Sequence, residues 1–279
     1  MASRGLDDIV ARVEAGERLG AEDGVRLLTT HDLLTVGRLA RLACRRRHGD
    51  RVYFVVNRHI NHTNICVNGC RFCAFSRKPG DPDAFTLTVD QVEARALASR
   101  GLNVSELHIV GGLNPDLDLD YYVRMLRRLR RALPGVQIKA LTAVEIDYLA
   151  WREGLTVEEV LRVLQDAGLA SLPGGGAEVF SPRVRRLVCP QKIGGERWLE
   201  IHAAAHRLGI PTNATMLYGH VETPAERVDH LLRLRDLQDR TGGFLAFIPL
   251  AFQPRRTALN ALPGTTGCDD LKTIAVARL

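Results

Sequence analysis

The chain has 279 residues, ordinary shares of apolar (46%) and charged (25%) residues, and a formal net charge of +6 with a sequence pI near 9.2. It contains no run of about 18 uncharged apolar residues, and its N-terminus lacks the apolar core of a signal peptide, so we expect a cytoplasmic protein without membrane insertion. The positive charge suits an anionic small substrate, and nucleic acid is not expected as a partner, because no aromatic residue interleaves with the arginines of the densest basic run, 124–131.

The first part of the chain is predicted to be helical. Residues 1 to about 48 divide into three pieces with helical patterns, the last of them DLLTVGRLARLACRRRH. We therefore expect an N-terminal helical segment, 1–48, followed by a main domain, 49–279.

A regular alternation of strands and helices follows. Short β-rich or buried apolar runs predict strands at 52–57, 106–112, 137–146, 170–180, 211–220 and 244–252. Helical patterns lie between them, at 88–101, 118–133, 156–168, 195–209 and 223–242. Thr156 and Glu159 form a capping box, and Thr223 before Pro224 is a typical helix start.

This alternation predicts an α/β fold with a parallel sheet inside and helices outside. Right-handed crossovers curl such a sheet into a barrel, here a partial (β/α)6 TIM-like barrel. An open doubly wound sheet is the alternative, but no G-x-G-x-x-G motif follows the first predicted strand. The segment 269–279 begins a helical pattern and stops, so we expect a C-terminally truncated sequence that lacks one or two further units.

Half of the six cysteines crowd into one stretch, NICVNGCRFCAF, residues 64–75. Cys66, Cys70 and Cys73 follow the first predicted strand, and the loops after the strands of a parallel barrel form its active face. Three thiolates on one short loop are typical of ligands to a single metal centre. The sequence therefore predicts a metal site here.

The number of cysteines leaves several kinds of metal site open. Structural zinc takes four ligands, so zinc would need His59 or His62 as well. A [4Fe–4S] cluster usually takes four cysteines, and with three ligands one iron stays open for a small molecule. Cys189 or Cys268 is a fourth ligand in principle, although each is expected to be a core or surface thiol.

The spacing C-x3-C-x2-C, with the aromatic Phe72 before the last cysteine, resembles the radical SAM superfamily. The resemblance implies a (β/α)6 partial barrel and a [4Fe–4S] cluster on Cys66, Cys70 and Cys73, whose open iron binds S-adenosylmethionine (SAM). It also implies that Phe72 packs near the adenine of SAM.

Longer stretches of the sequence indicate which subgroup of the superfamily the chain resembles. The stretches at 59–75, 106–122 and 171–193 are similar to the aminofutalosine synthase family of menaquinone biosynthesis. Dehypoxanthine futalosine cyclase and the tyrosine-using subunit of deazaflavin synthase belong to the same subgroup and remain alternatives. A structural module that binds zinc or a cluster is an alternative of a different class.

The resemblance implies a specific reaction. A 5′-deoxyadenosyl radical from SAM would add to 3-[(1-carboxyvinyl)oxy]benzoate, and loss of bicarbonate would give aminodeoxyfutalosine. An electron donor such as flavodoxin or ferredoxin would be the protein partner.

The remaining candidate residues follow the later strands. Gly111 and Gly112 resemble the segment that binds the methionine amino group, but Leu113 stands where many relatives carry Glu, so only a backbone role carries over. Glu178, after the triple glycine, and Asn213, on the fifth strand, are candidates for binding SAM.

Catalytic and substrate-binding roles are predicted for four residues. His220 lies past the end of the fifth strand and is a candidate general acid or base, and Glu178 is the second catalytic candidate. Arg183 and Arg185 are predicted to grip the two substrate carboxylates. Lys139 and Glu145 are weaker candidates for the site, and His108, in the middle of a predicted strand, is expected to have a structural role inside the protein.

Overall fold

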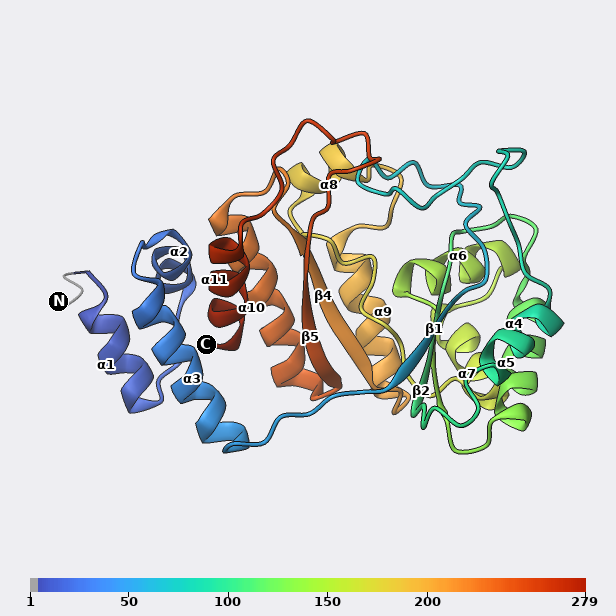
Figure 1. Ribbon diagram of the computed structural model, residues 1–279, viewed down its shortest axis with the longest axis horizontal. Coiled ribbons are helices and arrows are strands. Elements are labelled where there is room, and N and C mark those ends of the chain that lie inside the picture. Colours follow the sequence, from blue (N-terminus) through green and yellow to red (C-terminus); the bar gives the residue numbers. More distant parts are fainter. Residues whose placement is uncertain (1–4) are drawn as a thin grey trace.

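The computed structural model describes residues 5–279 (Figure 1). Its chain begins with three helices, α1 (Asp7–Ala15), α2 (Ala21–Thr29) and α3 (Leu33–His48), as the sequence predicts. The side chain of Asp32 starts α3 by accepting a hydrogen bond of 3.0 Å from the backbone N–H of Thr35.

Five strands follow, and all of their pairings are parallel. β1 (Asn57–Asn61), β2 (Glu106–Val110) and β3 (Gln137–Ala140) form one sheet in chain order, and β4 (Thr212–Tyr218) pairs with β5 (Phe244–Ala251). Two isolated bridges join the sheets, because Ser171 pairs with Lys139 of β3 and Leu172 pairs with Thr212 of β4. Six strand positions thus succeed one another, which confirms the prediction of a partial TIM-like barrel.

Helices follow the strand positions and cover the outside of this sheet (Figure 1). Four of them begin with a capping box, including the one predicted at Thr156. The predicted N-cap Thr223 is confirmed, and it also forms a capping box with Glu226. Among the described residues, no helix is both long and apolar enough to cross a membrane. The helices are α4 (Val89–Leu97), α5 (Leu119–Ala132), α6 (Ala143–Glu153), α7 (Val157–Ala167), α8 (Pro182–Val188), α9 (Gly195–Arg207), α10 (Pro224–Thr241) and α11 (Gly267–Arg278).

Strand alternation separates the two faces of the sheet. Leu107 and Ile109 of β2 are buried in the main core with residues of α4 and α5. Glu106, His108 and Val110 therefore lie on the opposite, concave face. Parallel barrels bind their ligands at the C-terminal ends of the strands, so the site is expected where this face meets the loops that follow the strands.

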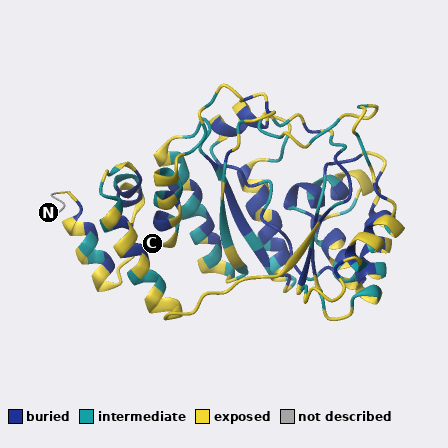
Figure 2. Cartoon of the chain, in the orientation of Figure 1, coloured by how far each residue is buried: buried dark blue, intermediate teal, exposed yellow. Residues whose placement is uncertain are grey.

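The N-terminal helices have a second core, which they share with the C-terminal part of the chain. Leu27 and Leu39 are buried with Val228 of α10 and Val276 of α11. Figure 2 shows that the segment linking α3 to β1 is exposed, and this segment has no regular secondary structure. We propose a boundary near residue 48 between a helical segment and the barrel domain, as the sequence suggested.

Three expectations about elements were wrong. The first strand is Asn57–Asn61 rather than 52–57, and the apolar residues before it are exposed, Phe54 by 88%. Their β-propensity is not matched by a partner strand, since pairing with the loop before β2 begins only at Val56, whose carbonyl accepts from Ser105 N–H. Helix α6 was not predicted, because 137–146 was assigned to a strand and its exit loop. The strand predicted at 170–180 is reduced to single bridges at Ser171 and Leu172, and no element was predicted for the stretch after it, where α8 lies.

Three histidines are fully buried among the helices and strands: His62, His202 and His230. Burial lowers the pKa of His62 to about 4 and that of His230 to about 3, and it lowers the pKa of His202 well below its usual value. A lowered pKa means that the folded state binds fewer protons than the unfolded state in acid. The stability that depends on these groups is complete above about pH 6.5 and is lost as the pH falls toward 4.

We expect each of these histidines to remove roughly 2 kcal/mol from the free energy of unfolding between pH 7 and pH 5. Urea denaturation at both pH values measures the difference. His230→Gln keeps a side-chain donor for the carbonyl of Thr215, 2.9 Å from His230 Nε2, and should shrink the pH difference. His48→Gln, at an exposed position, should leave it unchanged. Equal slopes in both variants would contradict this account.

Candidate active site

The cysteines lie on a loop that folds back on itself between β1 and α4. Cys66 N–H donates to the carbonyl of Arg77 (3.0 Å), and Arg77 N–H donates to the carbonyl of Asn64 (2.8 Å). The side chain of Asn64 closes the loop from inside, accepting from Phe85 N–H at 2.8 Å and donating to the carbonyl of Asp83 at 2.9 Å. These bonds define the shape of the loop.

The loop crosses the C-terminal end of β2, and two glycines make room for it. A Cβ atom on Gly112 would clash with the carbonyl oxygen of Ile65, and one on Gly111 would clash with the ring of His62. Val67 N–H donates to the carbonyl of Leu113 (3.0 Å), which fastens the loop there. The pair Gly111–Gly112 is therefore required by close backbone approach.

The three cysteines share one cavity of about 200 Å³ at this edge of the barrel. It is also lined by predicted residues Phe72, Gly111 and Gly112, and by Val110, Thr142, Val144, Glu145, Gly176 and Lys192. Several of these come from loops after different strand positions, as expected for the active face of a parallel barrel.

The thiols fit a cluster better than zinc. All three are free, and Ser76 N–H points at Cys73 Sγ from 3.3 Å, as N–H groups do around cluster ligands. Neither proposed zinc ligand is suitably placed, since His62 Nε2 is 3.1 Å from Tyr122 Oη and His59 stacks on His108. Among the described residues, no group of three or more His, Cys, Asp or Glu side chains could hold a single metal ion.

Glu178 does not line the cavity itself, but it forms an ion pair with Lys192, which does. Its Oε1 is 2.7 Å from Nζ of Lys192, and that ammonium lies 5.2 Å from the centre of the Phe72 ring. Burial favours the neutral amine, but the Glu178 carboxylate outweighs it and raises the pKa of Lys192. Glu178 also has a left-handed backbone (φ 48°), which aims it back at Lys192.

Glu145 is a carboxylate on the cavity wall that the sequence patterns ranked low. As the third residue of α6, it accepts bonds from the N–H and hydroxyl of Thr142 (2.7 and 2.8 Å) and from Gly111 N–H (3.2 Å). Burial raises the pKa of Glu145 to about 7. The T-x-x-E capping signature directly after β3 is the signal that could have found it.

The predicted arginines do not line the cavity. Arg185 is buried and donates to the carbonyl of Ala177 at 2.7 Å and to that of Ile193. Arg183 forms a fork with Glu226, at 2.9 and 2.6 Å. These contacts favour structural roles for both, so their substrate-binding roles stay predictions.

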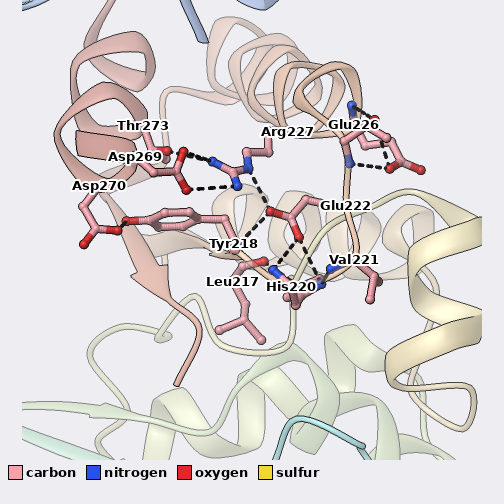
Figure 3. A network of polar contacts seen from close by, with 12 residues as sticks. Leu217, Tyr218, His220, Val221, Glu222, Glu226, Arg227, Asp269, Asp270 and Thr273 are labelled. Atoms are coloured by element: carbon pink, nitrogen blue, oxygen red, sulfur yellow. Dashed lines mark hydrogen bonds and ion pairs between the residues drawn. The ribbon is translucent and has the colours of Figure 1, made fainter. Parts of the chain in front are cut away.

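His220 lies at the predicted end of β4 but faces into the protein (Figure 3). Val221 N–H donates to its Nδ1 at 2.7 Å, and Nε2 is 3.0 Å from the carbonyl of Leu217. Glu222 links His220 to Arg227, which binds Asp269 of α11 (Figure 3). Burial lowers the pKa of His220. The network favours a role in joining β4, α10 and α11, and the catalytic role stays a prediction.

A polar cluster on the concave face lies below the cavity. Lys139 Nζ is 2.6 Å from Glu106 Oε2, and both side chains are more than 90% buried. His108 stacks on His59 with ring centres 5.1 Å apart. We call Glu106, His108, Lys139 and His59 the concave cluster. His108 precedes the cavity-lining Val110 by two residues on the same face, about 7 Å along the strand.

Asn213 also belongs to the concave side, but it does not line the cavity. Its backbone N–H donates to the carbonyl of Leu172 (2.9 Å), and Gly174 packs against its carbonyl oxygen. Its predicted contact with SAM stays a prediction.

A family model for the radical SAM superfamily matches residues 60–234, more than half of the chain. The chain belongs to the radical SAM superfamily. Members of this superfamily are enzymes that use a [4Fe–4S] cluster and SAM, so the cofactors expected from the cysteine spacing are confirmed.

Two curated relatives are similar over nearly the whole chain. The aminodeoxyfutalosine synthase of Thermus thermophilus is 49% identical, covering 99% of this chain and 77% of that protein. The 5-amino-6-(D-ribitylamino)uracil–L-tyrosine 4-hydroxyphenyl transferase of Methanopyrus kandleri is 41% identical, covering 98% and 75%. The two relatives thus carry the names of different enzymes.

The fold has a solved counterpart. A crystal structure of HydG, a maturase of the [FeFe]-hydrogenase, superposes with a TM-score of 0.77 at 20% identity, over 100% of this chain and 63% of that one. At this identity the likeness supports the partial barrel alone.

Proposed function

We propose that the protein is an aminodeoxyfutalosine synthase, which joins the 5′-deoxyadenosyl group of SAM to 3-[(1-carboxyvinyl)oxy]benzoate in menaquinone biosynthesis. The observation that carries the proposal is the 49% identity, over 99% of the chain, to an enzyme of that name. The free thiols on one cavity support it, because they suit a cluster kept in a reducing compartment such as the cytoplasm.

The residues around the cavity have different proposed roles. When bound, the [4Fe–4S] cluster supplies the electron that splits SAM into methionine and a 5′-deoxyadenosyl radical. Cys66, Cys70 and Cys73 would hold it, and the main chain at Gly111 and Gly112 would lie against the methionine part of SAM. Glu145 offers a carboxylate oxygen on the same wall for an ammonium group.

The concave cluster is the proposed binding site of the substrate. Lys139 has three N–H donors and uses one toward Glu106, so it can also donate to a substrate carboxylate. The stacked rings of His59 and His108 offer a flat surface beside it for the benzoate ring. His108 precedes the cavity-lining Val110 by two residues on the same strand face, so a ligand bound there would lie next to the cavity of the cysteine loop.

The transferase of deazaflavin biosynthesis is the second candidate function. The observation that favours it is the 41% identity to the Methanopyrus kandleri enzyme over 98% of the chain. Its name implies tyrosine and a ribitylaminouracil as substrates, which also carry polar groups for the concave cluster.

Product analysis tests the proposal. The protein is reconstituted with iron and sulfide under anaerobic conditions, reduced with dithionite, and incubated with SAM and 3-[(1-carboxyvinyl)oxy]benzoate. We expect mass spectrometry to find aminodeoxyfutalosine, with bicarbonate released in equal amount. A parallel incubation replaces the benzoate by tyrosine and 5-amino-6-(D-ribitylamino)uracil.

Each other outcome contradicts the proposal in a different way. An adduct from tyrosine alone assigns the second function. Free 5′-deoxyadenosine without an adduct from either mixture keeps the superfamily chemistry but rejects both substrates.

A further inference from the structure

The outer surface of the cysteine loop is basic. Five exposed cations surround it: Arg71, Lys78, Arg186, Arg255 and Arg256. Arg71 stands inside the cysteine motif, Arg186 is on α8, and the last two follow β5. We call this set the basic rim.

Hydrogen bonds hold the three segments of the rim together. Arg71 N–H donates to the carbonyl of Val188 (2.8 Å), and its guanidinium donates to that of Leu187 (3.2 Å). Ala258 N–H, next to the last two arginines, donates to the carbonyl of Arg71 (2.9 Å). Figure 1 shows α8 and the loop after β5 beside the cysteine loop at one end of the barrel. The rim is thus one surface built from distant parts of the sequence.

The charges of the rim are uncompensated. Among the described residues, no carboxylate forms an ion pair with any rim cation, although the nearby Arg77 and Arg183 are paired with Asp83 and Glu226. Asp81 is the carboxylate closest to the rim in sequence, and it accepts the backbone N–H of Lys78. The surface therefore presents a positive field to solvent.

Apolar side chains stand among these cations. Val67, Leu187 and Phe75 are exposed by 43%, 42% and 41%. Val67 and Phe75 belong to the cysteine loop itself. Exposed apolar side chains that accompany cations on one surface are typical of a protein interface.

The proposed function requires a partner at this end of the barrel. SAM cleavage begins only after one electron has reached the cysteine loop from outside the chain. The radical adduct gives up one electron when it loses bicarbonate, so the outside electron primes the site and replaces electrons that are lost. We propose that the basic rim is the docking surface for an acidic one-electron carrier protein. This inference rests on the proposed function only in its need for a reductant. In docking, the reduced carrier loses one electron to the group held by the cysteines, and no atom or proton is transferred.

A charge-reversal pair tests the surface. Arg186→Glu with Arg255→Glu changes two rim positions that make no described side-chain hydrogen bond or ion pair and do not line the cavity. Arg41→Glu with Arg127→Glu makes the same change of charge at two exposed positions outside the rim. Flavodoxin is the probe, and calorimetry measures its binding at low salt and at about 0.2 M salt.

We expect the rim variant to weaken flavodoxin binding on the order of tenfold and to flatten its salt dependence, and the control variant to bind like the unchanged protein. SAM cleavage driven by reduced flavodoxin should fall in the rim variant, while cleavage driven by dithionite should not. Failure of the benzoate reaction would leave both readouts in place, so it is distinguishable from failure of this inference.

Three results would overturn the docking surface. Equal binding by the rim variant and the unchanged protein would show that the carrier docks elsewhere. Equal loss of dithionite-driven cleavage would mean that the arginines support the loop rather than the partner. A short RNA that competes as strongly as flavodoxin would identify a general polyanion surface.

Discussion

Serine at position 66, 70 or 73 is expected to abolish SAM cleavage. All three cysteines line one cavity, and a cluster held by two thiolates loses a corner. Mutating a residue that only hydrogen-bonds to a metal ligand typically lowers metal affinity or activity by about 10–100-fold. Replacing a ligand itself should therefore lower the rate of SAM cleavage by more than about a hundredfold. The measurements are iron and sulfide content after reconstitution, the brown absorbance, and 5′-deoxyadenosine formed per minute.

Two other cysteines provide controls. Cys268 is exposed, and Cys268→Ser should change neither iron content nor cleavage. Cys189 is 1% exposed and lies close enough to Cys70 to act on its charge, so Cys189→Ser decides whether a fourth thiol takes part. Full cleavage in any of the three motif variants would reject the cluster assignment. Loss of the cluster in Cys189→Ser would reject a three-cysteine site.

The cysteine loop and the barrel could be read from the sequence because both depend on local patterns. The spacing of Cys66, Cys70 and Cys73 lies within eight residues, and the β/α alternation comes from runs whose periodicity survives burial. The same reasoning misplaced the first strand, because 52–56 has the composition of a strand but no neighbour to pair with. Pairing is a property of the folded chain, and propensity cannot supply it.

The concave cluster could not be predicted from local sequence patterns, because it too depends on how the strands pair. Lys139 and Glu106 are far apart in sequence, and their contact depends on the register between β2 and β3, which sets His108 opposite Lys139. His220 illustrates the converse. Its position after β4 was predicted, but the turn that brings its ring against Glu222 and Val221 points it into the protein (Figure 3). The end of β4 was predictable from the sequence, while the side-chain direction in the turn that follows it was not.

Lys139→Met is expected to destabilise the protein strongly. Lys139 and Glu106 are a buried pair 2.6 Å apart, and removing one partner leaves the other charge buried without compensation. Such a change typically costs 3–5 kcal/mol, whereas replacing both partners with apolar residues of similar volume is often nearly neutral. Lys139→Met should therefore lose about 3–5 kcal/mol in urea denaturation, and Glu106→Leu with Lys139→Met should recover most of it.

The rescued double variant separates the structural from the functional role of Lys139. It has a stable fold and an intact cysteine loop, so it should still cleave SAM at close to the original rate. It lacks the ammonium that we propose for the substrate carboxylate, so formation of aminodeoxyfutalosine should fall at least about tenfold and KM for the benzoate should rise. If the product recovers together with stability, Lys139 serves only to neutralise Glu106, and the substrate carboxylates must be held elsewhere on the concave face.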